Sequence, residues 1–272
     1  GDNSRRKASL CIAAPALAAT AAIAYAQTDT QAEIERYREM LQDGNPAELT
    51  VMRGEELWKK PRGPKNASLE RCDLGKGPGV VKGVYAELPR YFADTDQVMD
   101  AEARLVHCQV TLQGFDRAEL VKKPFSGSGP ATDNEALVAY LVEESRGMPV
   151  AVPQSHPKEI EAYERGKKIF FYRGGPYDFS CASCHGDDDK RIRLQDLPNL
   201  LKPEPAQRAF TTWPAYRVSQ GALRTMQWRL NDCFRQQRFP ELVFTSPASI
   251  DLITFLGVNA KGGKMDSPAI KR

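Results

Sequence analysis

Hydrophobic residues recur at helical spacing through much of the first half of the chain. Segments 31–41, 52–58, 101–115 and 132–144 each place apolar side chains three or four positions apart, which is typical of helices that bury one face. Residues 75–79 are rich in glycine and proline, and such a backbone is too permissive for regular structure. The pattern therefore predicts a mainly α fold with loops between the helices.

The second half of the chain repeats the order of the first. A glycine precedes an aromatic residue by four positions at Gly54 and again at Gly166, and each lies on a predicted helix that leads to a cysteine. The pattern Arg-Leu-x-x-Cys occurs at residues 104–108 and 229–233, and an apolar helix closes each half. Matches in the same order indicate duplication of one helical unit.

The first 26 residues have the features of an export signal. Basic residues precede an apolar run from Leu10 to Ala24, and Ala24-Tyr25-Ala26 is a typical cleavage site. A transmembrane anchor is the alternative, but the run is shorter than the roughly 20 residues that a spanning helix needs. We therefore expect cleavage after about Ala26, a periplasmic location and no membrane span.

The rest of the chain is long enough for two small domains, and we expect them at residues 27–150 and 151–272, joined by a linker at 148–153. Of the 38 basic and 35 acidic residues of the whole chain, 35 and 34 lie outside the signal. This near balance argues against a nucleic-acid-binding protein. A hydrophobic content of 41% and a charged content of 27% are those of an ordinary globular protein.

The motif Cys181-x-x-Cys184-His185 indicates covalent attachment of one haem c. Two thiols on one helical turn can reach the two vinyl groups of the porphyrin, and the adjacent histidine supplies the proximal nitrogen to the iron. A zinc site would need more ligands than the few remaining histidines and thiols offer. A thioredoxin-type motif would need a βαβ setting, and the sequence pattern shows none. Haem attachment is the better interpretation.

Five cysteines remain after the signal, and two of them belong to the haem motif. Cys72 can pair with Cys108 in the first half, which leaves Cys233 unpaired. A loop of about 36 residues closed in this way would stabilise the fold by roughly 3–4 kcal/mol. The competing pairing joins Cys233 to Cys72 or Cys108 and would link the two halves.

The function depends on which residue binds the iron on the side opposite His185, and the main candidates for this second ligand are Met226 and Cys233. They are seven residues apart, two turns of one predicted helix, so they share a face. A methionine ligand would raise the potential and give an electron carrier, whereas a thiolate would lower it. Most methionines on helix faces only pack in the core. His107 and His156 are weaker candidates because of their positions in the chain.

Arginines surround Cys233 in the sequence. Residues 207–240 contain six arginines, with Asp232 as the only acid. Such a segment predicts an anion pocket that favours the thiolate over the thiol and attracts small oxyanions. Arg229 precedes Cys233 by one helical turn, so both side chains can contact the same bound anion.

The haem motif at 181–185, the pattern Arg229-x-x-x-Cys233-x-Arg235-Gln236 and a cysteine-bearing first half together resemble SoxA. SoxA is the larger subunit of the periplasmic SoxAX cytochrome of sulfur oxidation. The resemblance covers most of the chain after the signal and implies two cytochrome c-like helical domains. Many relatives carry a second haem motif in the first domain. This sequence has only Cys-Asp-Leu-Gly-Lys at 72–76, so we expect that domain to lack haem.

The resemblance also implies roles for individual residues. Cys181 and Cys184 would attach the haem and His185 would be its proximal ligand. Cys233 would be the axial ligand on the other side and could carry an extra sulfur as a persulfide. Arg229 would be the active-site arginine that binds thiosulfate.

The implied enzyme is an L-cysteine S-thiosulfotransferase, which joins thiosulfate oxidatively to a cysteine of a carrier protein. The carrier would be SoxYZ-like, and a SoxX-like small cytochrome c would complete a heterodimer and take the electrons. One rival hypothesis is a plain periplasmic electron-transfer cytochrome with Met226 on the iron. A second is a non-catalytic assembly subunit.

Overall fold

The computed structural model describes residues 43–127, 129–192 and 195–271. The predicted signal and the predicted helix over 31–41 lie outside these residues. Residues 45–272 form one compact unit, to which the helices and strands of the described residues belong.

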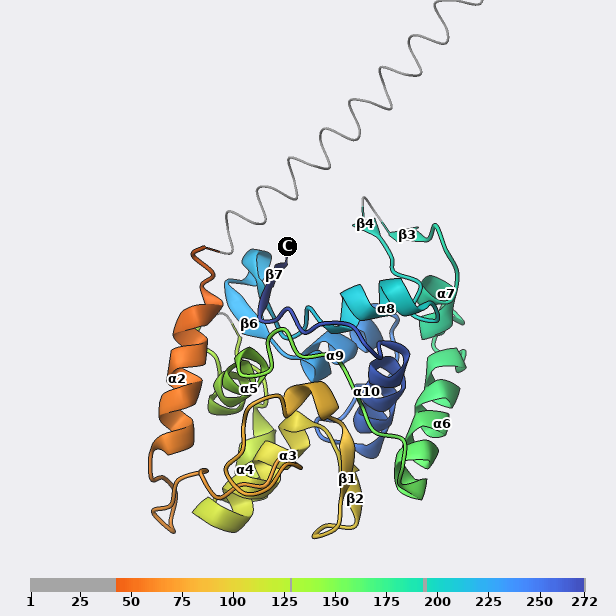
Figure 1. Ribbon diagram of the computed structural model, residues 1–272. Helices are drawn as coiled ribbons and strands as arrows, with labels where there is room; N and C mark the ends of the chain where they lie inside the picture. The colour runs from red at the N-terminus through yellow and green to blue at the C-terminus, as the bar shows by residue number, and fades with distance from the viewer. Residues whose placement is uncertain (1–42, 128, 193–194, 272) are drawn as a thin grey trace, which may run out of the picture. The chain divides into compact units, whose positions relative to one another are not determined.

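The described residues are mainly helical, as the hydrophobic pattern predicts, and Figure 1 shows their arrangement. The α-helices are α2 (Ala47–Lys59), α3 (Ala101–Cys108), α4 (Arg117–Lys122), α5 (Asp133–Glu143), α6 (Pro157–Phe171), α7 (Cys181–His185), α8 (Pro203–Phe210), α9 (Met226–Gln236) and α10 (Pro247–Asn259). Shorter helical turns are η1 (Tyr85–Glu87), η2 (Gln109–Gln113) and η3 (Val218–Gln220). In the described part of the chain, no helix is both long and apolar enough to span a membrane.

The strands of the described residues are short and form three small sheets. The antiparallel hairpins are β1 (Arg90–Phe92) with β2 (Gln97–Met99), and β3 (Arg191–Ile192) with β4 (Gln195–Asp196). A three-stranded sheet has the order β6 (Ala222–Arg224), β5 (Ala215–Arg217), β7 (Ala269–Lys271), in which β5 and β6 are antiparallel and β5 and β7 are parallel. Strand β6 of this sheet ends directly before the helix that carries Cys233.

The first half is built around the packed pair α2 and α5 (Figure 1). Gly54 lies where the helices meet: a Cβ at this position would lie 2.0 Å from the carbonyl oxygen of Ala136. Helix α5 begins with a capping box, in which Thr132 accepts from the backbone N–H of Glu135 and the Glu135 side chain accepts from the N–H of Thr132. The close approach of α2 to α5 requires glycine at position 54, because a side chain there would clash with the backbone of α5.

The second half repeats this arrangement with α6 and α10 (Figure 1). A Cβ on Gly166 would lie 2.0 Å from the carbonyl oxygen of Asp251. Gly54 and Gly166 are the two positions that the sequence repeat aligns, so the repeat corresponds to the same helix-to-helix contact in each half. One continuous hydrophobic cluster contains residues of both halves, including Leu105 and Leu252.

The predicted linker at 148–153 is held by backbone hydrogen bonds. Val150 donates its N–H to the carbonyl of Gly263 and accepts from the N–H of Gly262, both at 2.8 Å. Val150 and Val152 are also buried. The segment is thus an ordered part of the fold.

The disulfide is the first of the two pairings considered from the sequence. Cys72 and Cys108 are joined, with their Cα atoms 5.7 Å apart, and both residues are buried. Among the described residues, the free cysteines are Cys181, Cys184 and Cys233. The predicted pairing is confirmed, and Cys233 is unpaired.

Candidate functional site

Helix α7 is a short helix that presents the haem motif. Ser180 is its N-cap, and Ser180 and Ser183 form a capping box through their hydroxyl oxygens. Cys181 and Cys184 are both half-buried and lie one turn apart. The local sequence therefore fixes the two thiols on the same face of one helical turn.

The imidazole of His185 is oriented by the backbone. Its Nδ1 lies 2.9 Å from the carbonyl oxygen of Pro198, so the ring donates Nδ1–H and leaves the lone pair of Nε2 free. Burial lowers the pKa of His185, and Arg229 lowers it further, which favours the neutral ring. Two adjacent thiols and a neutral imidazole with Nε2 free are the donor set that a c-type haem needs.

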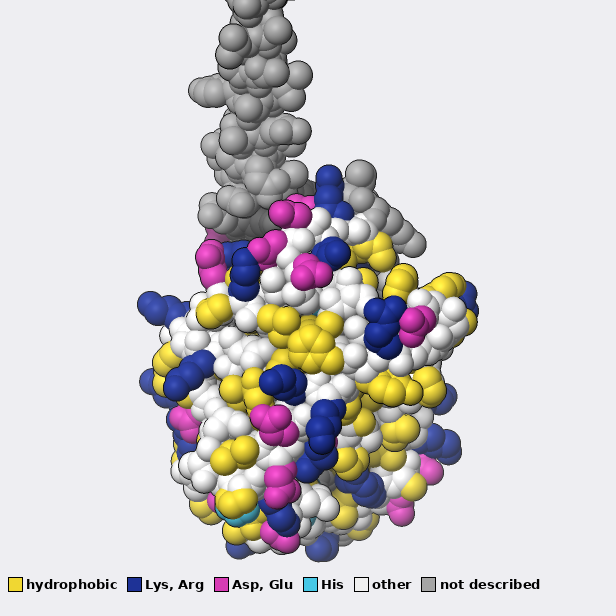
Figure 2. Space-filling view, turned by 90° about the vertical axis from the view of Figure 1, so that its right-hand side faces the viewer, with side chains coloured by type: hydrophobic (Ala, Val, Ile, Leu, Met, Phe, Trp, Pro, Cys, Tyr) yellow, Lys and Arg dark blue, Asp and Glu magenta, His cyan; other side chains and the backbone are white. Residues whose placement is uncertain are grey.

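Aromatic side chains are exposed beside this motif. Phe171, Tyr172, Tyr177 and Phe179 lie between the end of α6 and the start of α7 and are 45–68% exposed. Figure 2 faces this side of the molecule and shows hydrophobic side chains grouped among charged ones. An apolar surface next to the paired thiols fits a flat porphyrin ring, so the residues present fit the group.

Helix α9 carries Arg229 and Cys233. Its N-cap is Thr225, whose side chain accepts from the N–H of Trp228. Arg229 donates through Nη1 to Asp232 Oδ2 at 3.1 Å. Arg229 and Cys233 lie one turn apart along this helix, and Arg229 acts electrostatically on the thiol.

The thiols of α7 and α9 are close enough to influence each other. Burial raises the pKa of the Cys181 thiol to about 12, and Cys233 adds to the effect. The pKa of Cys233 is in turn raised by Cys184. The structure thus brings Cys181, Cys184, His185, Arg229 and Cys233 into one region.

The protonation of Cys233 differs from the expectation. Arg229 and Arg217 lower the pKa of this thiol, but burial is the largest influence and raises it, with a further rise from Asp232. The net shift of the Cys233 pKa is upward, so the effect of burial is larger than that of the two arginines. The arginines therefore act on the thiol in the predicted direction, but the sequence shows only these charges and not the burial that outweighs them.

The arginine-rich segment is also less convergent than predicted. Arg224 is buried and turned elsewhere: its guanidinium donates to the carbonyls of Ser126 and Gly127. Arg208 pairs with Glu204 on the surface, and the exposed Arg235 pairs with Asp232. The arginines that act electrostatically on Cys233 are Arg229 and Arg217.

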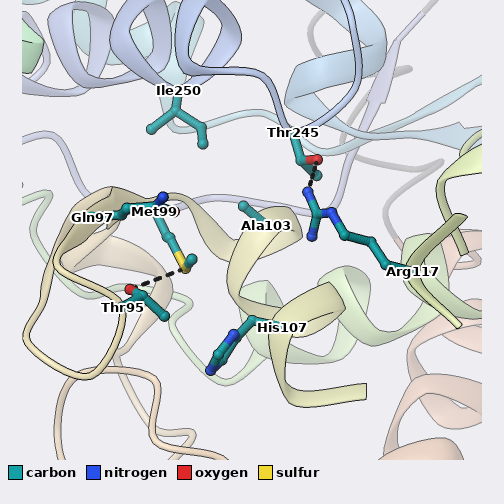
Figure 3. A pocket seen from close by; sticks show the side chains of 8 residues that line it. All are labelled: Thr95, Gln97, Met99, Ala103, His107, Arg117, Thr245 and Ile250. Atoms are coloured by element: carbon teal, nitrogen blue, oxygen red, sulfur yellow. Dashed lines mark hydrogen bonds between the residues drawn. The ribbon is translucent and has the colours of Figure 1, made fainter. Parts of the chain in front are cut away.

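The structure also gives the places of Met226 and of the histidines outside the motif. Met226 is the first residue of α9 and is buried in the hydrophobic core. His156 is the N-cap of α6 and stacks on Tyr91, with ring centroids 3.6 Å apart. His107 lines a cavity of about 440 Å³, shown in Figure 3.

The cavity in Figure 3 does not contain the haem motif. It is lined by Thr95, Gln97, Met99, Ala103, His107, Arg117, Thr245 and Ile250. At one side of it, Arg117 donates to the Thr245 hydroxyl at 2.9 Å. The cavity is therefore separate from the region around Cys233.

Three contributors to the site were missed from the sequence. Asp232 accepts hydrogen bonds from Arg229, Arg235 and Gln236, and its isolation among arginines was the available signal. The partner of His185 is the backbone carbonyl of residue 198, which no side-chain pattern reveals. Arg217 was counted only as one of six arginines, although its Nε is buried and without a hydrogen-bond partner among the described residues.

Comparisons with known proteins agree on one family. A family model described as "SoxA/TsdA, cytochrome c domain" matches residues 53–150. The chain is 55% identical to the L-cysteine S-thiosulfotransferase subunit SoxA of Hydrogenophilus thermoluteolus over 239 residues, which are 88% of this chain and 87% of the relative. It is 33% identical to a protein of the same name from Hydrogenobacter thermophilus (strain DSM 6534 / IAM 12695 / TK-6), with 92% of each chain covered.

The fold is that of a solved structure as well. The crystal structure of SoxXA from P. pantotrophus superposes with a TM-score of 0.68, at 24% identity, and covers 84% of this chain and 79% of that chain. The expected mainly helical, cytochrome c-like architecture is therefore confirmed. The length covered, the sequence identity and the matched cytochrome c domain show that this chain belongs to the SoxA family.

Proposed function

We propose that this chain is the SoxA subunit of an L-cysteine S-thiosulfotransferase, which joins thiosulfate to a cysteine of a sulfur carrier protein. The observation that carries the proposal is the placement of an unpaired thiol, Cys233, and of Arg229 beside the haem motif on α7. The relatives named for this activity cover most of the chain, which supports the same assignment.

The residues of α7 and α9 would hold one haem c. Cys181 and Cys184 would form the thioether bonds, and His185, through Nε2, and Cys233 would be the protein ligands to the iron. When bound, the haem supplies one-electron redox chemistry and a metal that tunes the reactivity of the Cys233 sulfur. The first half would carry the disulfide Cys72–Cys108 and no haem.

Arg229 and Arg217 would bind the sulfonate oxygens of thiosulfate. Both place positive charge near Cys233, and guanidinium groups form strong charge-assisted hydrogen bonds to oxyanions. The Nε of Arg217 is buried and has no hydrogen-bond partner in the part of the chain that the structure describes, so it offers a donor for such an oxygen. Binding in this way would direct the outer sulfur of thiosulfate towards the Cys233 sulfur.

The reaction then balances in two steps. The outer sulfur of thiosulfate and the Cys233 thiolate, or its persulfide, form a sulfur–sulfur bond, and two electrons leave in one-electron steps, each to an oxidised SoxX-like cytochrome c. The thiolate of the SoxYZ-like carrier attacks that outer sulfur, the sulfur–sulfur bond formed in the first step breaks, and Cys233 leaves in the form in which it entered, as the thiolate or the persulfide. The carrier retains the conjugated thiosulfate. A periplasmic location, a cleaved signal and a heterodimer with the SoxX-like partner complete the proposal.

Paired variants on α9 test the proposal. Arg229→Gln and Arg235→Gln each remove a guanidinium that pairs with Asp232. The side chain of Arg235 is 74% exposed, whereas that of Arg229 is 28% exposed. We expect Arg229→Gln to lower thiosulfate turnover at least tenfold and Arg235→Gln to leave it within about twofold. Cys233→Ala should abolish transfer while haem stays attached, as read by absorbance and intact mass.

Three results would overturn the proposal. Retained turnover in Cys233→Ala would remove this thiol from the mechanism. Equal effects of the two arginine variants would show that only the surface charge of α9 matters. A ferric methionine-to-iron charge-transfer band in the wild-type protein would favour Met226 as the ligand and a plain electron carrier.

A further inference from the structure

The first turn of α9 is anchored by buried groups from the other half of the chain. Asp100 and Glu102 lie at the start of α3, and both are almost fully buried. Asp100 caps α3 by accepting from the N–H of Ala103 at 2.8 Å through Oδ1. Its second oxygen, and the carboxyl of Glu102, face the start of α9.

Gln227 is the residue of α9 that they hold. Its side chain donates through Nε2 to Asp100 Oδ2 at 2.7 Å, and its backbone N–H donates to Glu102 Oε2 at 3.1 Å. Its Oε1 accepts from the N–H of Thr245 at 2.7 Å and from the hydroxyl of Ser249 at 3.3 Å. Gln227 is 2% exposed. One buried amide thus joins α3, α9 and the start of α10.

These contacts fix the rotation of α9 about its axis. Gln227 lies two residues before Arg229 and six before Cys233 on the same helix. A side-chain atom about 5 Å from the axis of an α-helix moves about 0.9 Å for a rotation of about 10°. A buried group with several hydrogen bonds in defined directions resists such a rotation better than apolar packing does.

We propose that Gln227 is a positioning residue, which sets the placement of Arg229 and Cys233 by locking α9 to Asp100 and Glu102 of the first half. This inference rests on the proposed function for its kinetic consequence, although its structural part does not. Through this contact, residues of the half without a haem motif would help to orient the proposed reactive residues of the other half. The network contains no atom expected to touch thiosulfate.

The state of Glu102 is consistent with a fixed joint. Burial raises the pKa of this carboxyl well above its ordinary value, and the neighbouring Asp100 raises it further. A neutral Glu102 still accepts the N–H of Gln227, and a glutamine at this position would do the same. On the far side, Thr245 is held by Arg117 in the cavity of Figure 3, so the joint is braced at both ends.

The test compares Gln227→Leu with Gln109→Leu in the haem-loaded protein with its cytochrome partner. Gln109 is a matched control, since it is 1% exposed and its side chain bonds only to Leu105 and Asn134 among the described residues, within the first half. Three quantities are measured: amide hydrogen exchange of residues 226–236, the ferric absorption spectrum, and kcat and KM for thiosulfate.

We expect Gln227→Leu to speed exchange in 226–236 more than tenfold, to change the ligand signature in the ferric spectrum, and to lower kcat by about 10–100-fold, the range for a misplacement near 1 Å. Gln109→Leu should change none of the three. The proposal fails if Gln227→Leu keeps the wild-type exchange and spectrum, or if Gln109→Leu alters both equally. Absence of thiosulfate transfer in the wild type would refute the proposed function alone, because exchange and spectrum still decide the role of Gln227.

A second pair covers the case in which Gln227→Leu does not fold. Glu102→Leu removes the acceptor for the Gln227 N–H, whereas Glu102→Gln keeps an oxygen in its place. We expect Glu102→Leu to show the same changed spectrum and lowered kcat as Gln227→Leu. Glu102→Gln should show the wild-type spectrum and a kcat within about twofold of wild type. Identical behaviour of the two variants would contradict a positioning role.

Discussion

Replacing Gly54 or Gly166 with alanine separates two physical effects that have opposite signs. Both glycines lie inside helices, where alanine is favoured over glycine by about 1 kcal/mol. If helix propensity alone decided the outcome, Gly54→Ala and Gly166→Ala would each stabilise the protein. The structure places both positions against the backbone of a second helix, so we expect the reverse.

The magnitude comes from the contacts at each glycine. A Cβ would lie 2.0 Å from a carbonyl oxygen at either position, and 2.9 Å from the Cβ of Tyr140 or of Phe255. Neither contact can be relieved by turning a flexible side chain, so the helices must separate. Overpacking of this kind typically costs about 1–3 kcal/mol or more. Because the contacts are with backbone and with Cβ atoms, we take the upper end of this range, about 3 kcal/mol, and after the gain of about 1 kcal/mol in helix propensity we expect each variant to lose about 2 kcal/mol of unfolding free energy.

Urea denaturation followed by circular dichroism in the far ultraviolet measures this change. Gly127→Ala is the control, because its added Cβ would have no atom of the described residues within 4 Å apart from the glycine and its chain neighbours, and it should stay within about 0.5 kcal/mol of wild type. A loss of about 2 kcal/mol would also lower the melting temperature by about 4–8 °C. A gain of stability in Gly54→Ala or Gly166→Ala would refute the reasoning, since it would mean that the helices do not touch there.

Two further predictions concern stability. Removing the disulfide with Cys72→Ala and Cys108→Ala should lower the unfolding free energy by about 4 kcal/mol, from the entropy of a loop of 36 residues; a urea midpoint equal to that of wild type would contradict this. Glu102 binds its proton more tightly in the folded state, because burial and Asp100 raise its pKa well above 4.5. Stability should therefore fall as pH rises from about 4.5 towards that folded pKa, by up to about 1.4 kcal/mol per pH unit. Glu102→Gln should reduce this slope, and parallel profiles of the two proteins would show that Glu102 does not titrate in this way.

The helices were predictable because each leaves a mark within a short stretch of sequence. The segments 52–58, 101–115 and 132–144 have a helical period, and the structure forms helical elements over all three. The sequence repeat also indicated which glycines mattered, since Gly54 and Gly166 take equivalent places. Local periodicity and internal comparison were sufficient for this part of the fold.

The candidate site was predictable only where its chemistry is written in adjacent residues. Cys181, Cys184 and His185 form a motif, and Arg229 and Cys233 lie one helical turn apart. The state of the thiol was not predictable in the same way. Burial outweighs Arg229 and Arg217 in setting the pKa of Cys233. Desolvation is a property of the packed interior, and a charge count cannot measure it.

The joint at Gln227 shows why the rest could not be found. In the sequence it is one polar residue on a helix, which usually indicates a position facing solvent. Its partners Asp100 and Glu102 lie 127 and 125 residues earlier, where they would also be expected at the surface. Buried polar groups are generally hydrogen-bonded, so the burial of Gln227 cannot be predicted without its two partners, nor theirs without Gln227. The haem motif identifies where the chemistry would occur, whereas the orientation of the helix facing it is set by contacts that no local pattern records.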